Sequence, residues 1–251
     1  ERHQYILNKL HEQGYVNVSD LGRELSVSVV TIRKDLKILE DRQLLFRTHG
    51  SATPGNPYVN NRPVDEKEKI CVQQKQQIAQ KAISLIKPGD SIILASGSTI
   101  LELAKLILNR QSENLTVVTA SANVAALLNK LESIEIWQLG GVMRKGSVSV
   151  VGPIAEKMLE GFSCNLLFMG ADGIDVSFGI TTTNALEASL NQNMMKSAQK
   201  VILLADSSKF GRRGFGKICD LSQLDLIITD SGMPDGLCNQ IESLGVDVIK
   251  V

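Results

Sequence analysis

From residue 91 onward, short runs of β-forming residues alternate with stretches whose apolar residues recur at helical spacing. Strands separated by helices pair in parallel, so this alternation predicts an α/β fold with a mainly parallel sheet covered by helices on both faces. We expect strands at 91–95, 115–120, 134–139, 165–170, 200–205, 225–229 and 246–250, and helices near 99–109, 121–131, 153–160, 184–198 and 235–244.

The first 50 residues have a different pattern, with apolar residues at helical spacing throughout. Two prolines and a glycine in residues 51–57 discourage regular structure and indicate a domain boundary. Apolar residues on one face of 78–86 predict a connecting helix. The length of 251 residues suits two domains, so we expect a first domain over 1–56, a linker and the start of the connecting helix over 57–76, and an α/β domain over 77–251.

Charge and composition limit the partners of the chain. Lys plus Arg and Asp plus Glu number 27 each, so any surface for nucleic acid must be local. No apolar run reaches the roughly 18 residues that cross a bilayer, and the first residues do not form a signal peptide, so we expect a cytoplasmic protein with no membrane partner. The four cysteines are far apart and no histidine lies near them, so we expect no metal site and no cofactor.

Three short helices are predicted in the first domain. Ile6 and Leu10 mark the apolar face of a first helix that Gly14 can end, and Ser19 can cap a second. Ser28 can cap a third helix, in which Ile32, Leu36 and Leu39 face the core.

This register leaves one end and one face of the third helix free, as in the recognition helix of a helix-turn-helix. Arginine there can bind guanine, and the methyl groups of Val and Thr can contact thymine. The residues of the third helix that we expect at DNA are Ser28, Val29, Val30, Thr31, Arg33, Lys34 and Lys37.

Residues 44–50 can form a short hairpin, or wing, in which Arg47 and His49 would meet the DNA backbone. Each basic residue taken alone is more often part of a solvated helix face. The combination of three helices, a basic third helix and a basic wing favours a winged helix-turn-helix.

The segments 27–36 and 47–50, with Leu39 and Glu40 between them, resemble the N-terminal signature of the DeoR family of bacterial transcription regulators. Two positions depart from that signature. Gln43 stands where the family usually has glycine, and Ser51 stands where a second glycine is common. Gln43 would cost strain if its φ were positive.

Polar residues follow several predicted strands, where ligands of parallel sheets bind. The turn Ser96-Gly97-Ser98-Thr99 leads into a helix whose N-terminal amides can bind a phosphate, although turns of this kind often bind no ligand. Lys209 can pair with an anion, and Asp172 or Glu187 can accept hydrogen bonds from sugar hydroxyls. Further candidates in such loops are Ser121, Asn123 and Gly141.

The segments 170–174, 181–187 and 206–211 resemble the DeoR-family sensor domain over about residues 77–235, which is itself similar to ribose-5-phosphate isomerase. The resemblance implies a repressor of a sugar-metabolism operon that binds double-stranded operator DNA and responds to a phosphorylated sugar effector. Ala95 replaces a usual aspartate and Ala120 a usual asparagine, so fewer polar groups face the ligand than in the family.

A sugar-phosphate isomerase-like enzyme is the alternative, with Glu187, Asp172 and Lys209 as its acid and base groups. A DNA-binding domain has no use in such an enzyme, so we expect a regulator without catalytic residues. Two-fold operators need two copies of the DNA-binding domain, so we expect a homodimer or homotetramer. The effector would act by a population shift that the connecting helix carries between the domains.

Overall fold

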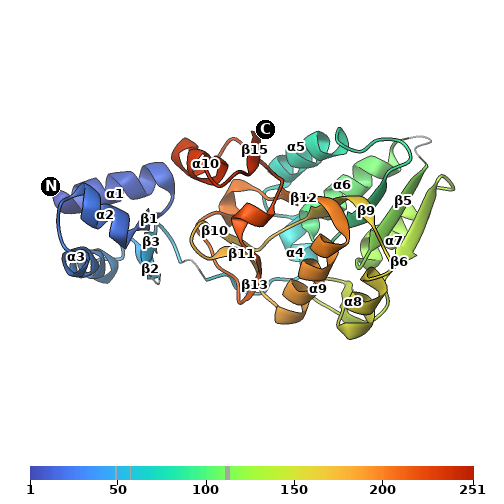
Figure 1. Ribbon diagram of the computed structural model, residues 1–251, viewed down its shortest axis with the longest axis horizontal. Coiled ribbons are helices and arrows are strands. Elements are labelled where there is room, and N and C mark those ends of the chain that lie inside the picture. Colours follow the sequence, from blue (N-terminus) through green and yellow to red (C-terminus); the bar gives the residue numbers. More distant parts are fainter. Residues whose placement is uncertain (49, 57, 111–113) are drawn as a thin grey trace.

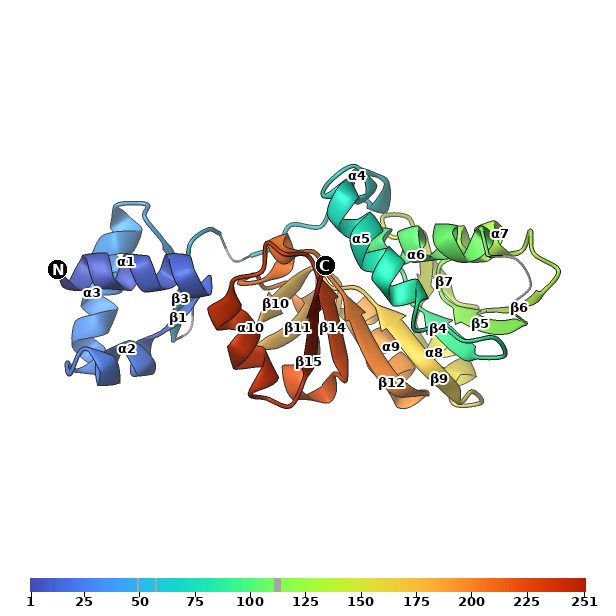
Figure 2. The same ribbon diagram turned by 90° about the horizontal axis from the view of Figure 1, so that it is seen from above.

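The computed structural model describes residues 1–48, 50–56, 58–110 and 114–251. A small helical head lies at one end of the long axis, and an extended segment joins it to a larger α/β domain (Figures 1 and 2). We call residues 1–53 the head, residues 54–71 the linker and residues 72–251 the sensor. No helix in the described ranges is long and apolar enough to cross a membrane.

The head is a winged helix-turn-helix, as predicted. Its elements are α1 (Arg2–Gln13), β1 (Val16–Asn17), α2 (Val18–Glu24), α3 (Val29–Asp41), β2 (Phe46–Thr48) and β3 (Ser51–Thr53). The three strands form an antiparallel sheet in the order β1-β3-β2. Ile32, Leu36 and Leu39 are buried in its core, which confirms the predicted register of the third helix.

The structure confirms two of the three predicted ends of the head helices and contradicts the third. Gly14 ends α1 in the left-handed conformation, with φ of 70°. Ser28 caps α3, since its Oγ accepts a hydrogen bond from the Thr31 amide at 3.1 Å. The prediction that Ser19 caps the second helix is wrong: Asn17 is the cap, and its Oδ1 accepts from the Ser19 amide at 2.8 Å.

The prediction that residues 51–57 lack regular structure is wrong for their first part. Residues 51–53 form β3, which lies between β1 and β2, and all three are buried. The prolines and the glycine follow this strand and do not interrupt it. Gln43 has φ of 60°, so a glutamine occupies the left-handed conformation that favours glycine.

A buried carboxylate fastens α1 to α3. Asp35 accepts hydrogen bonds from Arg2 Nε at 2.6 Å and Nη2 at 2.9 Å, and His3 Nε2 lies 2.9 Å from its Oδ1. The hydrogen bond from Arg2 lowers the pKa of Asp35 against the opposing effect of burial. This contact sets the position of α3 on the rest of the head.

We expect Asp35→Asn to lower the free energy of unfolding of the head by about 1–3 kcal/mol, because a charged acceptor of hydrogen bonds is lost. The lowered pKa means that Asp35 stabilises the fold above its unfolded pKa of about 3.9 and loses this effect as pH falls through the folded pKa. Urea unfolding should therefore show a difference between the variants that shrinks in acid. Asp41→Asn, at an exposed position of the same helix, is the control; an equal loss there would contradict the role of Asp35.

Seven strands of the described chain form one parallel sheet in the order β15-β14-β12-β9-β4-β5-β6. They are β4 (Ser91–Leu94), β5 (Leu115–Thr119), β6 (Ile134–Gln138), β9 (Cys164–Met169), β12 (Ala198–Leu204), β14 (Leu226–Thr229) and β15 (Asp247–Lys250). Each overlaps one predicted strand, so the predicted α/β class is confirmed.

Helices cover both faces of this sheet, as the views in Figures 1 and 2 show. They are α5 (Val72–Ile83), α6 (Ser98–Leu108), α7 (Ala122–Leu128), α8 (Pro153–Leu159), α9 (Ala185–Lys196) and α10 (Asp235–Glu242). One apolar core packs α5, α6 and α7 against the sheet, and a second packs α8, α9 and α10 on the other face. The predicted connecting helix is α5, which begins at Val72.

Several short elements were not predicted. They are α4 (Val64–Glu68), the hairpin β7 (Val142–Arg144) and β8 (Ser149–Val151), and the small antiparallel sheet of β10 (Gly173–Asp175), β11 (Gly179–Thr182) and β13 (Gly216–Cys219), with 3-10 turns at Ser207–Lys209 and Leu221–Gln223. Residues of α4, β7, β11 and the turn at Ser207–Lys209 line the cavity at the carboxyl edge of the main sheet and add walls that the parallel strands alone do not supply.

The loop between β12 and β13 joins the sensor to both the linker and the head. The Arg213 carbonyl oxygen accepts a hydrogen bond from the Val59 amide at 2.9 Å. The Arg213 side chain forms an ion pair with the buried Asp175, with Nε 2.8 Å from Oδ2. Gly211 faces the Gly14 carbonyl so closely that a Cβ at Gly211 would lie 3.2 Å from that oxygen. This loop therefore contacts both the linker and the head.

Candidate functional sites

The N-terminal end and outer face of α3 are open to solvent. The exposed side chains there are Val29, Val30, Arg33, Lys34 and Lys37, with Val30 60% exposed. The three cations make no hydrogen bond or ion pair with any described residue, so they are available to a ligand. The hydroxyls of Ser28 and Thr31 lie 2.9 Å apart and belong to the helix cap.

The wing is tied to α3 through one ion pair. Arg47 Nε lies 2.6 Å from Glu40 Oε2, and the Arg47 amide donates to Glu40 Oε1 at 3.0 Å. The hydrogen bond from the Arg47 side chain lowers the pKa of Glu40. Arg47 was predicted to contact the DNA backbone, and its guanidinium is here held by Glu40. His49, the other predicted wing residue, lies outside the described residues.

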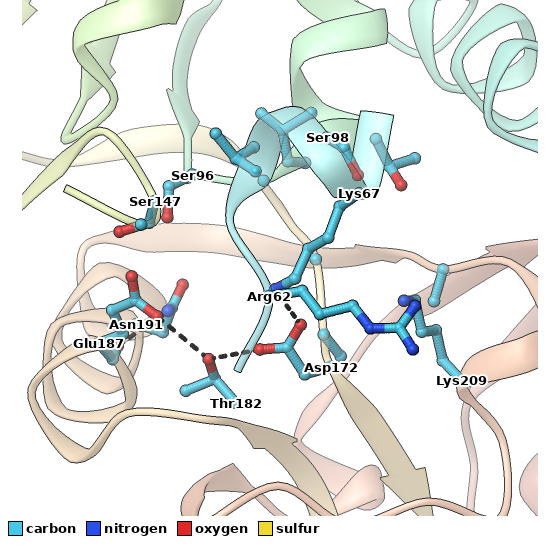
Figure 3. Close-up of a pocket in the computed structure, with 18 of the residues that line it drawn as sticks. Arg62, Lys67, Ser96, Ser98, Ser147, Asp172, Thr182, Glu187, Asn191 and Lys209 are labelled. Carbon is cyan, nitrogen blue, oxygen red and sulfur yellow. Dashed lines mark hydrogen bonds and ion pairs between the residues drawn. The ribbon is translucent and has the colours of Figure 1, made fainter. Parts of the chain in front are cut away.

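A polar pocket lies beyond the carboxyl ends of β4, β9 and β12, where the strand order predicts a ligand (Figure 3). Its described lining comes from five regions: Asn61, Arg62, Val64 and Lys67 of the linker; Ser96, Gly97, Ser98, Thr99 and Ile100; Arg144, Gly146 and Ser147; Gly170, Ala171, Asp172, Thr182, Glu187 and Asn191; and Leu204, Ala205 and Lys209.

Seven of the ten predicted ligand residues line this pocket: Ser96, Gly97, Ser98, Thr99, Asp172, Glu187 and Lys209. The other three, Ser121, Asn123 and Gly141, are not among its lining residues. The reason is the β7–β8 hairpin, which pairs with residues 120–122: the Val150 amide donates to Ala120 O, and the Ala122 amide donates to Val148 O, both at 3.0 Å. Ser121 instead caps α7 by accepting from the Val124 amide at 3.3 Å.

Asp172 is the charged centre of the pocket. Lys67 Nζ lies 2.6 Å from its Oδ1, and the Thr182 hydroxyl donates to its Oδ2 at 3.0 Å. Burial alone would raise the pKa of Asp172, but the charges of Lys67 and Lys209 and the hydrogen bonds to the carboxylate hold that pKa below its ordinary value. The carboxylate therefore stays charged near neutral pH.

Three polar atoms in the pocket have no hydrogen-bond partner among the described residues. They are Glu187 Oε1, Asn191 Oδ1 and Arg144 Nη1. Glu187 is only 9% exposed, and its nearest charge is Arg144 Nη1, 3.4 Å from Oε2. Buried polar atoms cost free energy when they are unpaired. Two acceptors and one donor at this position fit a ligand rich in hydroxyl groups.

The opposite side of the pocket suits an anion. Ser98 and Thr99, both buried, begin α6, and the first amides of a helix attract negative charge. Arg62 and Lys209 line the same pocket and make no hydrogen bond or ion pair within the described chain. Figure 3 shows Arg62 and Lys67 reaching over Asp172 from the linker, with Lys209 on the side away from Glu187 and Asn191.

Sequence reasoning missed seven polar residues of the pocket: Asn61, Arg62, Lys67, Arg144, Ser147, Thr182 and Asn191. Arg62 and Lys67 belong to the linker, and Arg144 belongs to a hairpin that was not predicted. Asn191 follows Glu187 by four residues on α9, so helical spacing could have found it.

Comparisons with known proteins cover both domains. Residues 2–56 match the family model of a DeoR-like helix-turn-helix domain, and residues 70–231 match that of a DeoR C-terminal sensor domain. The chain is 37% identical over 254 residues to an Escherichia coli O157:H7 protein named, provisionally, as the aga operon transcriptional repressor, with 100% of this chain and 93% of that protein covered.

Two further relatives extend this similarity. The transcriptional regulator GlpR of Haloferax volcanii is 35% identical, with 99% of this chain and 96% of that protein covered. The L-fucose operon activator of Haemophilus influenzae is 33% identical, with 98% of each covered. Among solved structures, a D-ribose-5-phosphate isomerase in complex with phospho-erythronic acid is 17% identical, with a TM-score of 0.42 over 55% of this chain and 54% of that chain.

Proposed function

We propose that this chain, which belongs to the DeoR family of transcription regulators, binds operator DNA through its head and represses a sugar-metabolism operon until a phosphorylated sugar fills the pocket. The proposal joins two sites at opposite ends of the molecule. Each has its own support in the contacts described above.

The DNA-binding part of the proposal rests on α3. Arg33, Lys34 and Lys37 are exposed and unpaired, so they can bind phosphates or base edges without breaking an existing contact. Val29 and Val30 lie at the end of α3 that would enter the major groove first. A two-fold operator requires two heads, so the active species is a homodimer or a homotetramer.

The effector part rests on one observation: unpaired acceptors and unpaired cations line the same pocket. A phosphate would bind at the start of α6, where Lys209 supplies a charged donor. The sugar hydroxyls would donate to Glu187 Oε1 and Asn191 Oδ1. The relatives named for the aga and L-fucose operons support a sugar as the source of the effector.

The coupling between the two sites would run through the linker. Lys67 lies on this segment and pairs with Asp172 inside the pocket. An anionic ligand would compete with Asp172 for Lys67, and the linker would shift with it. The loop that carries Lys209 also contacts the linker and the head, so a bound ligand favours one arrangement of the heads over another.

We propose that the protein does not catalyse a reaction on the sugar phosphate. An isomerase would need a carboxylate poised to take a proton from carbon, with a pKa near the working pH. The lowered pKa of Asp172 and its ion pair with Lys67 oppose that role. The relatives described above carry the names of transcription regulators.

Fluorescence anisotropy with the promoter duplex tests the proposal. We expect the protein to bind its own promoter with at least about 1,000-fold preference over scrambled duplex at physiological salt. One class of phosphorylated sugar should reverse this binding, whereas the unphosphorylated parent sugar should not. Equal affinity for scrambled DNA, or turnover of the sugar phosphate, would overturn the proposal.

A further inference from the structure

A second cavity adjoins the ligand pocket. It is lined by Val59, Asn60, Arg62, Lys67, Ile70, Lys75, Asp172, Asp206, Ser208, Lys209 and Arg212. Five of these residues are basic and two are acidic. The cavity therefore has a formal surplus of positive charge.

The acidic residues offset only part of this charge, because the basic residues outnumber them. Asp172 is already paired with Lys67. Asp206 is buried and caps the 3-10 turn that follows β12, where its Oδ1 accepts from the Ser208 amide at 3.1 Å and from the Ser208 hydroxyl. The side chains of Arg62, Lys209 and Arg212 make no hydrogen bond or ion pair with any residue in the described ranges.

Lys75 adds a buried ammonium to the same cavity. It is 3% exposed, and its Nζ donates to the carbonyl oxygens of Ile70, at 2.6 Å, and Lys67. An ammonium has three N–H groups, so one remains for a ligand. No carboxylate of the described chain lies within ion-pair distance of it, and a buried charge without such a partner is costly.

The two cavities share Arg62, Lys67, Asp172 and Lys209. The Lys67–Asp172 ion pair thus lines both the cavity that contains Glu187 and Asn191 and the cavity that contains Lys75 and Arg212. A single ligand that displaces Lys67 from Asp172 can extend into both.

We propose that Arg62, Lys75 and Arg212 of the second cavity, the cationic compartment, bind a second anionic group of the effector. The effector then carries two anions, as a sugar bisphosphate or a phosphorylated sugar acid does. One anion binds at the start of α6, and the other binds in the cationic compartment. This inference rests on the proposed function and narrows its class of ligand.

Arg212 distinguishes the second compartment, because it lines this cavity and not the first. It also lies between Gly211, which faces Gly14 of the head, and Arg213, whose carbonyl binds the linker. An anion on Arg212 therefore acts directly on the loop that joins the two domains.

Isothermal titration calorimetry at one pH and salt concentration tests this inference on the full chain. The probes are a hexose 1-phosphate, a hexose 6-phosphate, the hexose 1,6-bisphosphate and a 6-phosphohexonate. We expect at least one two-anion probe to bind about tenfold or more tighter than both monophosphates, as an added charged hydrogen bond provides. Which of the two binds tighter tells whether the second anion is a phosphate or a carboxylate.

Arg212→Gln should remove this preference and leave monophosphate binding within about twofold. Arg212→Lys keeps the charge and should keep part of the preference. Arg42→Gln makes the same charge change at an exposed residue of the head and should leave all four affinities unaltered.

Two results would overturn the second subsite and leave the proposed function standing: monophosphates that bind as tightly as both two-anion probes, or an equal loss of all four ligands in Arg212→Gln with the melting temperature preserved. Absence of binding by every phosphorylated sugar, in a screen wider than these four probes, would overturn the proposed function itself.

Discussion

Replacing Lys209 with methionine is expected to abolish the release of operator DNA by the effector while DNA binding stays intact. Lys209 lines both cavities, and its ammonium makes no hydrogen bond or ion pair with a described residue, so it is available to the ligand. A hydrogen bond between charged groups contributes about 1.5–3 kcal/mol, which corresponds to a loss of roughly 10- to 150-fold in effector affinity. Anisotropy titrations of the protein–operator complex with effector measure this loss.

Lys200→Met is the matched control, since Lys200 lies on β12, the strand that leads to Lys209, but near its opposite end. Release of DNA by the effector should be normal in that variant. Normal release in Lys209→Met as well would show that the anion binds elsewhere.

Arg33→Ala is expected to weaken operator binding by roughly 5- to 150-fold if Arg33 binds a guanine through two hydrogen bonds, since such a contact contributes about 1–3 kcal/mol. Arg33 is exposed on α3 and has no ion pair to replace the lost contact. The loss of affinity should be large for operators that keep the base pair bound by Arg33 and small for operators in which that base pair is changed. Titrations against a set of single-base operator variants measure it.

Arg42→Ala removes the same charge at the far end of α3, where Arg42 is the C-terminal cap residue. We expect little change in its operator affinity. If Arg33→Ala instead weakens binding to every duplex equally, Arg33 contacts a phosphate and does not read a base.

The parallel sheet could be predicted from the sequence because its central strands contain apolar runs between helices. Ile92, Ile93 and Leu94, for example, are fully buried, and only a sheet covered on both faces gives such a continuous run. The short antiparallel strands show no such apolar run in the sequence. Strand β10 has three residues and begins at Gly173, which packs against the Arg212 carbonyl so tightly that a Cβ would lie 2.5 Å from that oxygen.

The pocket residues that directly follow a strand could be predicted from the position of that strand. Ser96 and Asp172 follow β4 and β9, so the rule for parallel sheets located them. Lys67 meets Asp172 across 105 residues of sequence, and no local pattern encodes that contact. Ser121 obeys the same rule as Ser96, but the unpredicted hairpin pairs with the residues around it, so the rule failed there.

The linker forms a wall of the pocket, and this has a practical consequence for chimeric regulators. The match to the sensor family begins at residue 70, yet Asn61, Arg62 and Lys67 line the cavity ahead of it. A fusion that grafts a foreign DNA-binding module at residue 70 would discard these side chains and lose ligand control. A junction at Pro54 or Gly55 retains them. The segment that must be transferred is therefore longer than the segment that the sensor family model matches.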